Sequence, residues 1–231
     1  MGKRIISQAR GKGSFTYRVR KKAFQHTIRY PQKHGEAEIL DIIHSAGHSA
    51  PLLKIKVDNE IFHNSAFNGA VTGQKISINS ENPAEGDVAQ LKYIPSGSPI
   101  YNIEINPGDG GKMIRTAGSS ATLLKNYGRK VSILMPNRKE ILLDENCRAT
   151  LGTIAGAGRN LKPIMKAGRN YYKMKARSKL WPRTSAVKVN AVDHPFGSGR
   201  GKRIKSKIAK RNAPPGKRVG HLRPRRTGHK R

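Results

Sequence analysis

The sequence predicts an all-β fold, in which a pair of small barrels carries a long basic extension at each end. Three observations support this prediction. Short apolar stretches separated by turn residues run through residues 36–158. No segment in that range has a helical apolar stripe longer than about two turns. The acidic residues are concentrated there, whereas both ends are almost purely basic.

Charge is distributed unevenly along the 231 residues, whose formal net charge is +32. Residues 1–35 hold ten Lys or Arg and no acid, residues 36–158 hold twelve against thirteen acids, and residues 159–231 hold twenty-four against Asp193 alone. A compact domain does not collect so much like charge unless a polyanion neutralises it. The ends are therefore predicted to bind a polyanion, although the sign of the charge does not separate nucleic acid from a membrane surface or an acidic protein.

The first 35 residues alternate basic residues with Gly, Ser and single aromatic residues, and show no sustained apolar period. Such a segment buries too little apolar surface to offset the entropy lost on ordering it. We predict that residues 1–35 form a basic arm that folds on its partner.

A first barrel is predicted over residues 36–92. In its second predicted strand, residues 53–57 alternate apolar and lysine side chains, which indicates that one face of the strand is buried and the other is exposed to solvent. Five short strands in about 55 residues fit a small closed barrel. The predicted strands are residues 37–44, 52–58, 60–67, 75–78 and 87–91.

A second barrel is predicted over residues 93–170, because a second series of apolar stretches follows the first. A tight reverse turn at residues 136–138 separates two of them. The predicted strands are residues 99–105, 121–124, 130–135, 139–143 and 149–155.

Beyond Gly156 the composition changes to Gly, Lys, Arg, Asn and Pro with few apolar residues. One short helix is predicted over residues 171–177. The rest of residues 171–231 is predicted to be an extended, basic, RNA-dependent chain.

The basic ends combine three features that suit RNA. Arg and Lys contact phosphates, Gly lets the backbone approach closely, and aromatic rings stack on unpaired bases. A solvated or disordered tail is the alternative, but such tails are usually simpler and dominated by Lys. The interleaved aromatic residues are Phe15, Tyr17, Phe24, Tyr30, Tyr171, Tyr172, Trp181 and Phe196.

Two glycine-rich segments suggest nucleotide-binding loops, and neither fits. A Walker A loop would need Gly where Asn106 stands, and Ser or Thr where Met113 follows Lys112. Gly156-Ala157-Gly158 follows a strand but precedes no long amphipathic helix, so a dinucleotide fold is not supported. The glycine-rich residues 106–112 are better interpreted as a loop that touches RNA backbone.

Metal, disulfide and membrane roles are not supported by the sequence. Of eight histidines, His44 and His48 alone have an i,i+4 spacing, and Gly47 between them argues against an aligning helix. The lone Cys147 excludes an internal disulfide and is expected to be buried. No apolar run approaches the roughly 18 residues that span a bilayer. We therefore expect no metal, no cofactor and a soluble, intracellular protein without membrane contact.

Asp193 and His194 stand side by side in the basic C-terminal region. A carboxylate can orient a histidine for proton transfer. Adjacent side chains of an extended segment point apart, however, and Ser185 and Ser198 lack the context of a nucleophile. A structural or RNA-contacting role is therefore predicted for this pair.

Several ordered motifs run along the chain. They are residues 107–112 (Pro-Gly-Asp-Gly-Gly-Lys), 147–152 (Cys-Arg-Ala-Thr-Leu-Gly), 162–163 (Lys-Pro), 166–168 (Lys-Ala-Gly), 173–177 (Lys-Met-Lys-Ala-Arg), 181–182 (Trp-Pro), 190–197 (Asn-Ala-Val-Asp-His-Pro-Phe-Gly) and 211–216 (Arg-Asn-Ala-Pro-Pro-Gly). Together they resemble the universal large-subunit ribosomal protein L-two family over essentially the whole chain. The opening residues 2–5 (Gly-Lys-Arg-Ile), Phe196 and the short chain resemble its archaeal branch.

This resemblance implies an OB-like barrel (36–92) followed by an SH3-like barrel (93–170), with both ends threaded through large-subunit rRNA. It implies a structural role in the large ribosomal subunit during translation, with primary rRNA binding, help in subunit association, and support of tRNA binding and peptide-bond formation. It also places the loop at Asp193, His194 and Pro195 towards the peptidyl transferase region. Before that loop the chain departs from the family, with Ser185-Ala186 in place of Arg-Gly and Lys188-Val189 in place of Ala-Met.

The predicted partners are large-subunit rRNA, neighbouring ribosomal proteins and the small subunit at an intersubunit bridge, with one copy in each ribosome. We predict no enzymatic activity. The alternatives are direct participation of His194 in peptidyl transfer, and a general nucleic-acid compaction or chaperone protein. The residues predicted to bind rRNA are Lys3, Arg4, Arg10, Lys12, Arg18, Arg20, Lys21, Lys22, Arg29, Lys112, Arg148, Arg159, Lys162, Lys166, Arg169, Lys173, Lys175, Arg177, Trp181, Arg183, Lys188, His194, Arg200, Lys202, Arg203, Arg211, Lys217, Arg218, Arg225 and Arg226.

Overall fold

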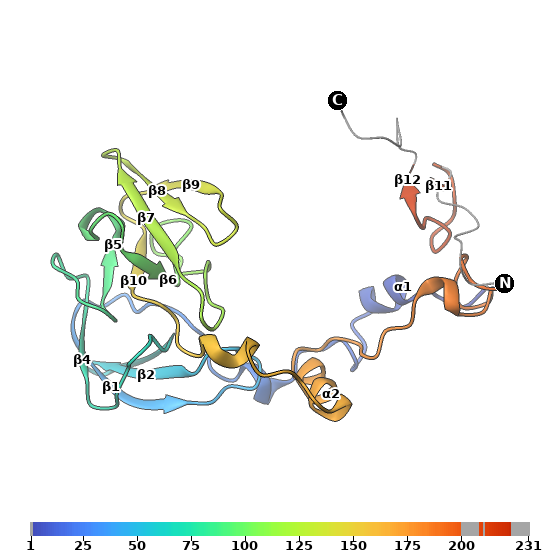
Figure 1. Ribbon diagram of the computed structural model, residues 1–231, viewed down its shortest axis with the longest axis horizontal. Helices are drawn as coiled ribbons and strands as arrows, with labels where there is room; N and C mark the ends of the chain where they lie inside the picture. Colours follow the sequence, from blue (N-terminus) through green and yellow to red (C-terminus); the bar gives the residue numbers. More distant parts are fainter. Residues whose placement is uncertain (1, 200–207, 210, 223–231) are drawn as a thin grey trace. The chain divides into compact units, whose positions relative to one another are not determined.

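The computed structural model describes residues 2–199, 208–209 and 211–222 (Figure 1). The chain divides into two compact units: Arg20–Met165, and the described residues of 1–19 together with those of 166–231. Residues 20–35, which the sequence assigned to the basic arm, therefore belong to the larger unit.

Ten strands build the larger unit, which confirms the all-β fold class. Each of them overlaps one of the ten stretches predicted as strands. They are β1 (Gly35–Ile43), β2 (Leu52–Val57), β3 (Glu60–Ser65), β4 (Lys75–Ile78), β5 (Val88–Gln90), β6 (Pro99–Tyr101), β7 (Ala121–Asn126), β8 (Lys130–Leu134), β9 (Glu140–Asp144) and β10 (Arg148–Leu151), with 3-10 turns η1 (Lys21–Phe24), η2 (Leu91–Tyr93) and η3 (Ala157–Asn160).

Strand β2 shows how the sequence pattern becomes a half-buried strand. Leu53, Ile55 and Val57 are at most 1% exposed, while Lys54 and Lys56 between them are directed to the wetter face. Successive side chains of a strand point to opposite faces, so this alternation places one face on the core. The predicted alternation over residues 53–57 is confirmed.

All ten strands form one continuous sheet, in the order β3-β2-β1-β4-β5-β10-β6-β7-β8-β9. Neighbouring strands run antiparallel except β4 and β5, which are parallel and paired through Ile78 and Val88. The two predicted barrels are thus joined by backbone hydrogen bonds through β5, β10 and β6 (Figure 1).

Two separate hydrophobic cores lie against this sheet. Neighbouring residues of one strand supply different cores: Val88 packs in the first core and Ala89 in the second, and likewise Tyr101 in the first and Ile100 in the second. Because alternate side chains leave opposite faces of a strand, β5 and β6 act as a shared wall between the cores. This wall explains how strands of only three residues each bury two adjacent side chains, Val88 and Ala89 in β5 and Ile100 and Tyr101 in β6.

The segment before β1 is anchored in the first core by Tyr30, which is only 2% exposed. Its hydroxyl donates a hydrogen bond to the Asn102 carbonyl oxygen (2.7 Å) and lies 2.7 Å from the Thr150 hydroxyl. Burial raises the pKa of the Tyr30 phenol well above its usual value, so the neutral donor is retained. The stacking role predicted for Tyr30 is therefore wrong, because its ring has no access to a base.

The smaller unit contains helices α1 (Ile6–Gly11) and α2 (Ala167–Ala176), the 3-10 turn η4 (Ala186–Lys188), and the parallel pair of β11 (Ile208–Ala209) and β12 (His221–Leu222). The helix predicted at residues 171–177 is confirmed and begins four residues earlier. Helix α1 was not predicted, because six residues are too few to show a helical period. Among the residues that the structure describes, none of the helices has the length and apolar content needed to cross a bilayer.

Candidate nucleic-acid interface

Most basic residues predicted to bind RNA lie at the surface of their unit. An exposed cation can pair with a phosphate without first breaking a contact within the protein, and its side chain can adjust to the RNA. The exposed members are Lys3, Arg4, Arg10, Lys12, Arg18, Lys166, Arg169, Lys173, Arg183, Lys188, Arg211, Lys217 and Arg218 in the smaller unit, and Arg20, Lys21, Lys22, Arg29, Lys112, Arg159 and Lys162 in the larger one.

The remaining predicted residues divide into three groups. Lys175, Arg177, Trp181 and His194 are half-buried, and Arg148 is buried. The predictions for Arg200, Lys202, Arg203, Arg225 and Arg226 lie outside the described residues.

Aromatic side chains accompany the cations at several exposed positions. Phe15 is 90% exposed, with the Arg18 guanidinium 5.4 Å from its ring centre. Tyr172 is 69% exposed, and the Lys175 ammonium lies 6.0 Å from its ring. Exposed rings next to cations can stack on bases while the cations contact phosphate. Tyr17, Trp181 and Phe196 are half-buried instead.

Arg148 does not reach the surface, and its prediction as an RNA contact is wrong. It is 6% exposed, and its guanidinium pairs with Glu104, which is fully buried, at 2.9 Å. Its Nη1 also donates to the carbonyl oxygen of Pro31 at 2.8 Å. A buried guanidinium must be paired and hydrogen-bonded, and here protein groups meet that need. Arg148 instead holds Tyr30 and Pro31 against strand β10.

The glycine-rich loop at residues 106–112 is tied to two carboxylates of its own neighbourhood. Glu104 accepts the backbone N–H groups of Gly108 (3.2 Å) and Gly110 (2.9 Å). Asp109 accepts the N–H of Gly111 at 3.0 Å, and its other oxygen lies 3.5 Å from the Lys112 ammonium. These three N–H groups therefore point at protein carboxylates, and the predicted contact of this loop with RNA backbone stays a prediction for its exposed residues. Lys112 remains exposed.

The same hydrogen bonds shift the acidity of Asp109. Burial raises the pKa of this carboxyl group, but three backbone N–H groups of its loop and the nearby Lys112 outweigh burial and hold the pKa below its ordinary value. The loop is thus locked by an ionised carboxylate at neutral pH.

Asp193 and His194 do not form a proton-transferring pair. The Asp193 carboxylate makes an ion pair with Lys3 at 3.6 Å, whereas the Nδ1 of His194 accepts the backbone N–H of Phe196 at 3.0 Å. Nδ1 therefore carries a lone pair, which places the proton of the neutral imidazole on Nε2. The two neighbouring side chains turn to different partners, as their adjacency predicted.

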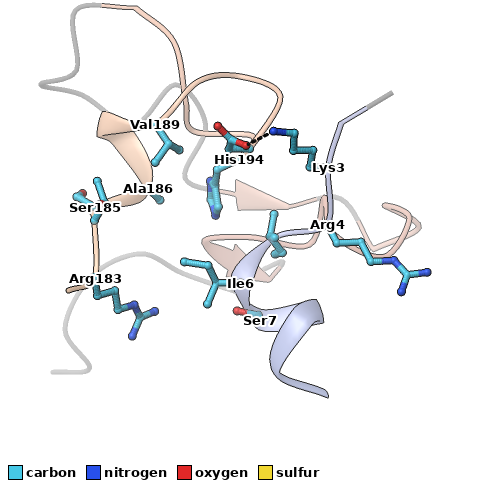
Figure 2. A pocket seen from close by; sticks show the side chains of 12 residues that line it. Lys3, Arg4, Ile6, Ser7, Arg183, Ser185, Ala186, Val189 and His194 are labelled. Carbon is cyan, nitrogen blue, oxygen red and sulfur yellow. Dashed lines mark ion pairs between the residues drawn. The ribbon is translucent and has the colours of Figure 1, made fainter. Parts of the chain in front are cut away.

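A pocket of about 480 Å³ lies in the smaller unit, next to this pair (Figure 2). One side comes from the N-terminal segment and the start of α1, and the other from the segment around η4. The two sides are linked by a hydrogen bond of 2.7 Å from the Lys3 backbone N–H to the Val192 carbonyl oxygen. The pocket was not predicted, because its walls are about 180 positions apart in the chain. Its lining is Lys3, Arg4, Ile5, Ile6, Ser7, Arg183, Thr184, Ser185, Ala186, Val189, Asp193 and His194.

A basic hairpin in the larger unit was missed by the sequence analysis. The β7–β8 turn carries Lys125, Arg129 and Lys130 around Tyr127, whose ring is 62% exposed and 5.4 Å from the Lys125 ammonium. Its mixture of cations, Gly and an aromatic ring matches the composition that marked the arms. The signal was hidden because residues 36–158 are balanced in charge as a whole.

Metal binding finds no support in the described part of the chain, where no three His, Cys, Asp or Glu residues are grouped to hold an ion. The Nδ1 of His48 lies 2.8 Å from the Ser45 hydroxyl oxygen. Burial is the main reason that the pKa of the His48 ring is lowered. Cys147 is fully buried, as predicted.

Comparison with known proteins identifies the chain's family. Residues 84–216 match the family model described as "Ribosomal Proteins L2, C-terminal domain". The chain is 42% identical over its full length to the whole "Large ribosomal subunit protein uL2" of Archaeoglobus fulgidus. It is 41% identical to the protein of the same name from Hyperthermus butylicus and 39% to that from Sulfolobus acidocaldarius, in each case over all of this chain and 99% of the relative.

The all-β unit with basic, largely exposed chain ends is therefore that of a ribosomal protein. The chain belongs to the ribosomal protein L2 family, archaeal type. The resemblance inferred from the ordered motifs is confirmed. Ser185, Ala186 and Val189, at which the resemblance led us to expect departures from the family pattern, line the pocket of Figure 2.

Proposed function

We propose that this protein is a structural component of the large ribosomal subunit in the cytoplasm, where it binds rRNA through its two basic ends. The observation that carries the proposal is the separation of charge. The excess of Lys and Arg lies outside the charge-balanced residues 36–158, and nearly all predicted cations in the described ends are exposed. Membership of the ribosomal protein L2 family supports the ribosomal role.

In this proposal the sheet unit, which covers the predicted ranges 36–92 and 93–170 as far as Met165, forms a rigid platform. The exposed cations of residues 1–35 and 171–231 neutralise phosphates where RNA helices crowd together. The basic β7–β8 hairpin adds a further RNA contact on the platform. If ten phosphates are contacted, the slope of log affinity against log salt is roughly −7 to −9 by the single-strand and duplex coefficients.

The finer roles are assistance in subunit association at an intersubunit bridge, and support of tRNA binding and of the peptidyl transferase region. The loop at Asp193, His194 and Pro195 is the part assigned to the last role. Peptide-bond formation itself is assigned to RNA. The ion pair of Asp193 with Lys3 supports this assignment, because it leaves His194 without a carboxylate that would strengthen it as a base.

Sedimentation tests the proposal against general nucleic-acid compaction. After cell lysis at moderate salt, the chain should travel with the large subunit at one copy per particle, together with neighbouring ribosomal proteins. Affinity for the large-subunit rRNA should exceed that for arbitrary duplexes of equal length and fall steeply with salt. Spread over nucleic acid without fixed stoichiometry, or an affinity nearly independent of salt, would contradict it.

A further inference from the structure

The pocket of the smaller unit combines an apolar wall with a cationic rim. Ile5, Ile6, Ala186 and Val189 supply the apolar part of the lining, and Ile5 is only 8% exposed. Lys3, Arg4 and Arg183 supply three cations, against the one carboxylate of Asp193. Figure 2 shows the Arg4 and Arg183 side chains on opposite sides of the pocket, with the His194 ring pointing toward Ile6 between them.

We propose that this pocket receives a single unpaired rRNA base, with the phosphates on either side of it held by the rim cations. The inference rests on the proposed function, since it names the RNA element that the smaller unit recognises. The volume of about 480 Å³ falls in the range of about 300–1,000 Å³ usual for small-ligand sites.

An apolar wall beside hydroxyl groups matches a nucleobase better than a bare phosphate. A base has a flat apolar face and a polar edge, and splayed-out bases are the usual targets of sequence-specific RNA recognition. Desolvating a phosphate against isoleucine and valine side chains would be costly. The hydroxyl groups of Ser7, Thr184 and Ser185 can both donate and accept, so they suit a base edge.

The charge of the rim favours RNA over a protein side chain. Asp193 is neutralised by Lys3, which leaves Arg4 and Arg183 as excess positive charge on two sides of the pocket. An aromatic side chain of another protein would fill the apolar part but bring no phosphate for these cations. A nucleotide brings both.

His194 is held ready to donate to a base. Its Nδ1 accepts the Phe196 N–H, so Nε2 carries the proton, and the Phe196 ring packs against it with centroids 5.0 Å apart. A fixed ring with one known donor can discriminate an acceptor on the base edge from a donor. His194 is thus assigned as a binding residue for the base.

Two measurements on reconstituted large subunits test this proposal. Short-wavelength ultraviolet light couples a base to a protein group in direct contact with it, and mass spectrometry then finds the modified peptide. Chemical probing of the rRNA bases finds nucleotides that the protein protects. The wild-type chain should carry a nucleotide on the peptide around residues 183–194 or on residues 3–7, and the same nucleotide should be protected from the probe.

Filling the pocket should remove both signals. Val189→Trp places a large ring in the lining, and Ser185→Leu is a milder filling variant for the case in which the larger change prevents assembly. Val187→Trp is the matched control, because Val187 is half-buried like Val189 but does not line the pocket. The crosslink and the protection should be lost in the filled variants and kept in the control.

Failure of this inference is distinguishable from failure of the proposed function. If the wild-type chain does not enter the large subunit, the proposed function fails. If it enters at one copy but the pocket peptides carry no nucleotide, or carry a protein crosslink instead, the pocket inference alone is overturned. The same holds if these peptides keep their nucleotide in the variants whose pocket is filled.

Discussion

Replacing Glu104 should destabilise the larger unit more than any surface substitution in it. This fully buried carboxylate accepts the backbone N–H of Arg148 at 2.8 Å and two contacts from its guanidinium at 2.9 and 3.2 Å. It also accepts the N–H groups of Gly108 and Gly110. One side chain thus joins β10, the glycine-rich loop and, through Arg148, the segment before β1.

The magnitude follows from leaving a buried cation without its anion. Removing one partner of a buried ion pair costs about 3–5 kcal/mol. Since small domains unfold with about 5–15 kcal/mol, Glu104→Ala should remove a large part of the stability. Glu104→Leu combined with Arg148→Met should cost less than Glu104→Ala, because no unpaired charge remains buried.

Urea unfolding of the full chain, followed by far-ultraviolet circular dichroism, measures these differences. Glu38→Ala is the matched control, since Glu38 is exposed on β1 and its loss should stay within about 0.5 kcal/mol. A loss below about 1 kcal/mol for Glu104→Ala, or a double variant less stable than the single one, would show that the pair does not hold these segments together.

Further predictions concern single side chains. The wild type should be more stable than Asp109→Asn at neutral pH. This difference should vanish as the pH falls from 3.8, the ordinary pKa of the carboxyl group, through the lowered pKa of Asp109 in the fold; the free energy of unfolding measured against pH checks this. Burial raises the pKa of Cys147 to about 11, so its thiol should resist a thiol reagent at about pH 8 until urea unfolds the chain. Gly111→Ala should lower the unfolding free energy by more than the about 1–3 kcal/mol of a left-handed backbone, because φ is +80° and the new Cβ would lie 2.4 Å from a carbonyl oxygen; Gly128→Ala, with φ +85° and open space, is its control. His194→Gln should reduce assembly, because a base contact is lost, while the subunits that do assemble keep an unchanged peptide-bond rate; a large fall in that rate with normal assembly would support catalysis by this residue.

Strand positions could be predicted well because they depend on local pattern. The alternation at residues 53–57 needs only neighbouring side chains, and turn residues mark where each strand ends. The pairing of the strands could not be predicted. Nothing local to Val88 and Ala89 shows that they face two different cores, since that depends on pairing with β4 and with β10, which lies much further along the chain.

The candidate RNA contacts show the same division. Arg148 and Arg159 are alike as residues, yet one is buried against Glu104 and the other exposed. Tyr30 and Phe15 both interrupt basic sequence, but only Phe15 is presented to solvent. Sequence composition identifies the residue types that bind RNA. The tertiary structure decides which of these side chains are buried and paired within the protein and which are exposed to a partner.

By itself, the sequence determined the all-β class, the order of the strands along the chain, the separation of a charge-balanced middle from basic ends, and the family. These properties are carried by composition, period and ordered motifs, which need no knowledge of distant contacts. Only the tertiary structure decided the shared wall between two cores, the buried Glu104–Arg148 pair and the pocket beside His194. Each of these depends on side chains brought together from distant positions, and burial then sets whether a charge is available to a partner or must be neutralised within the fold.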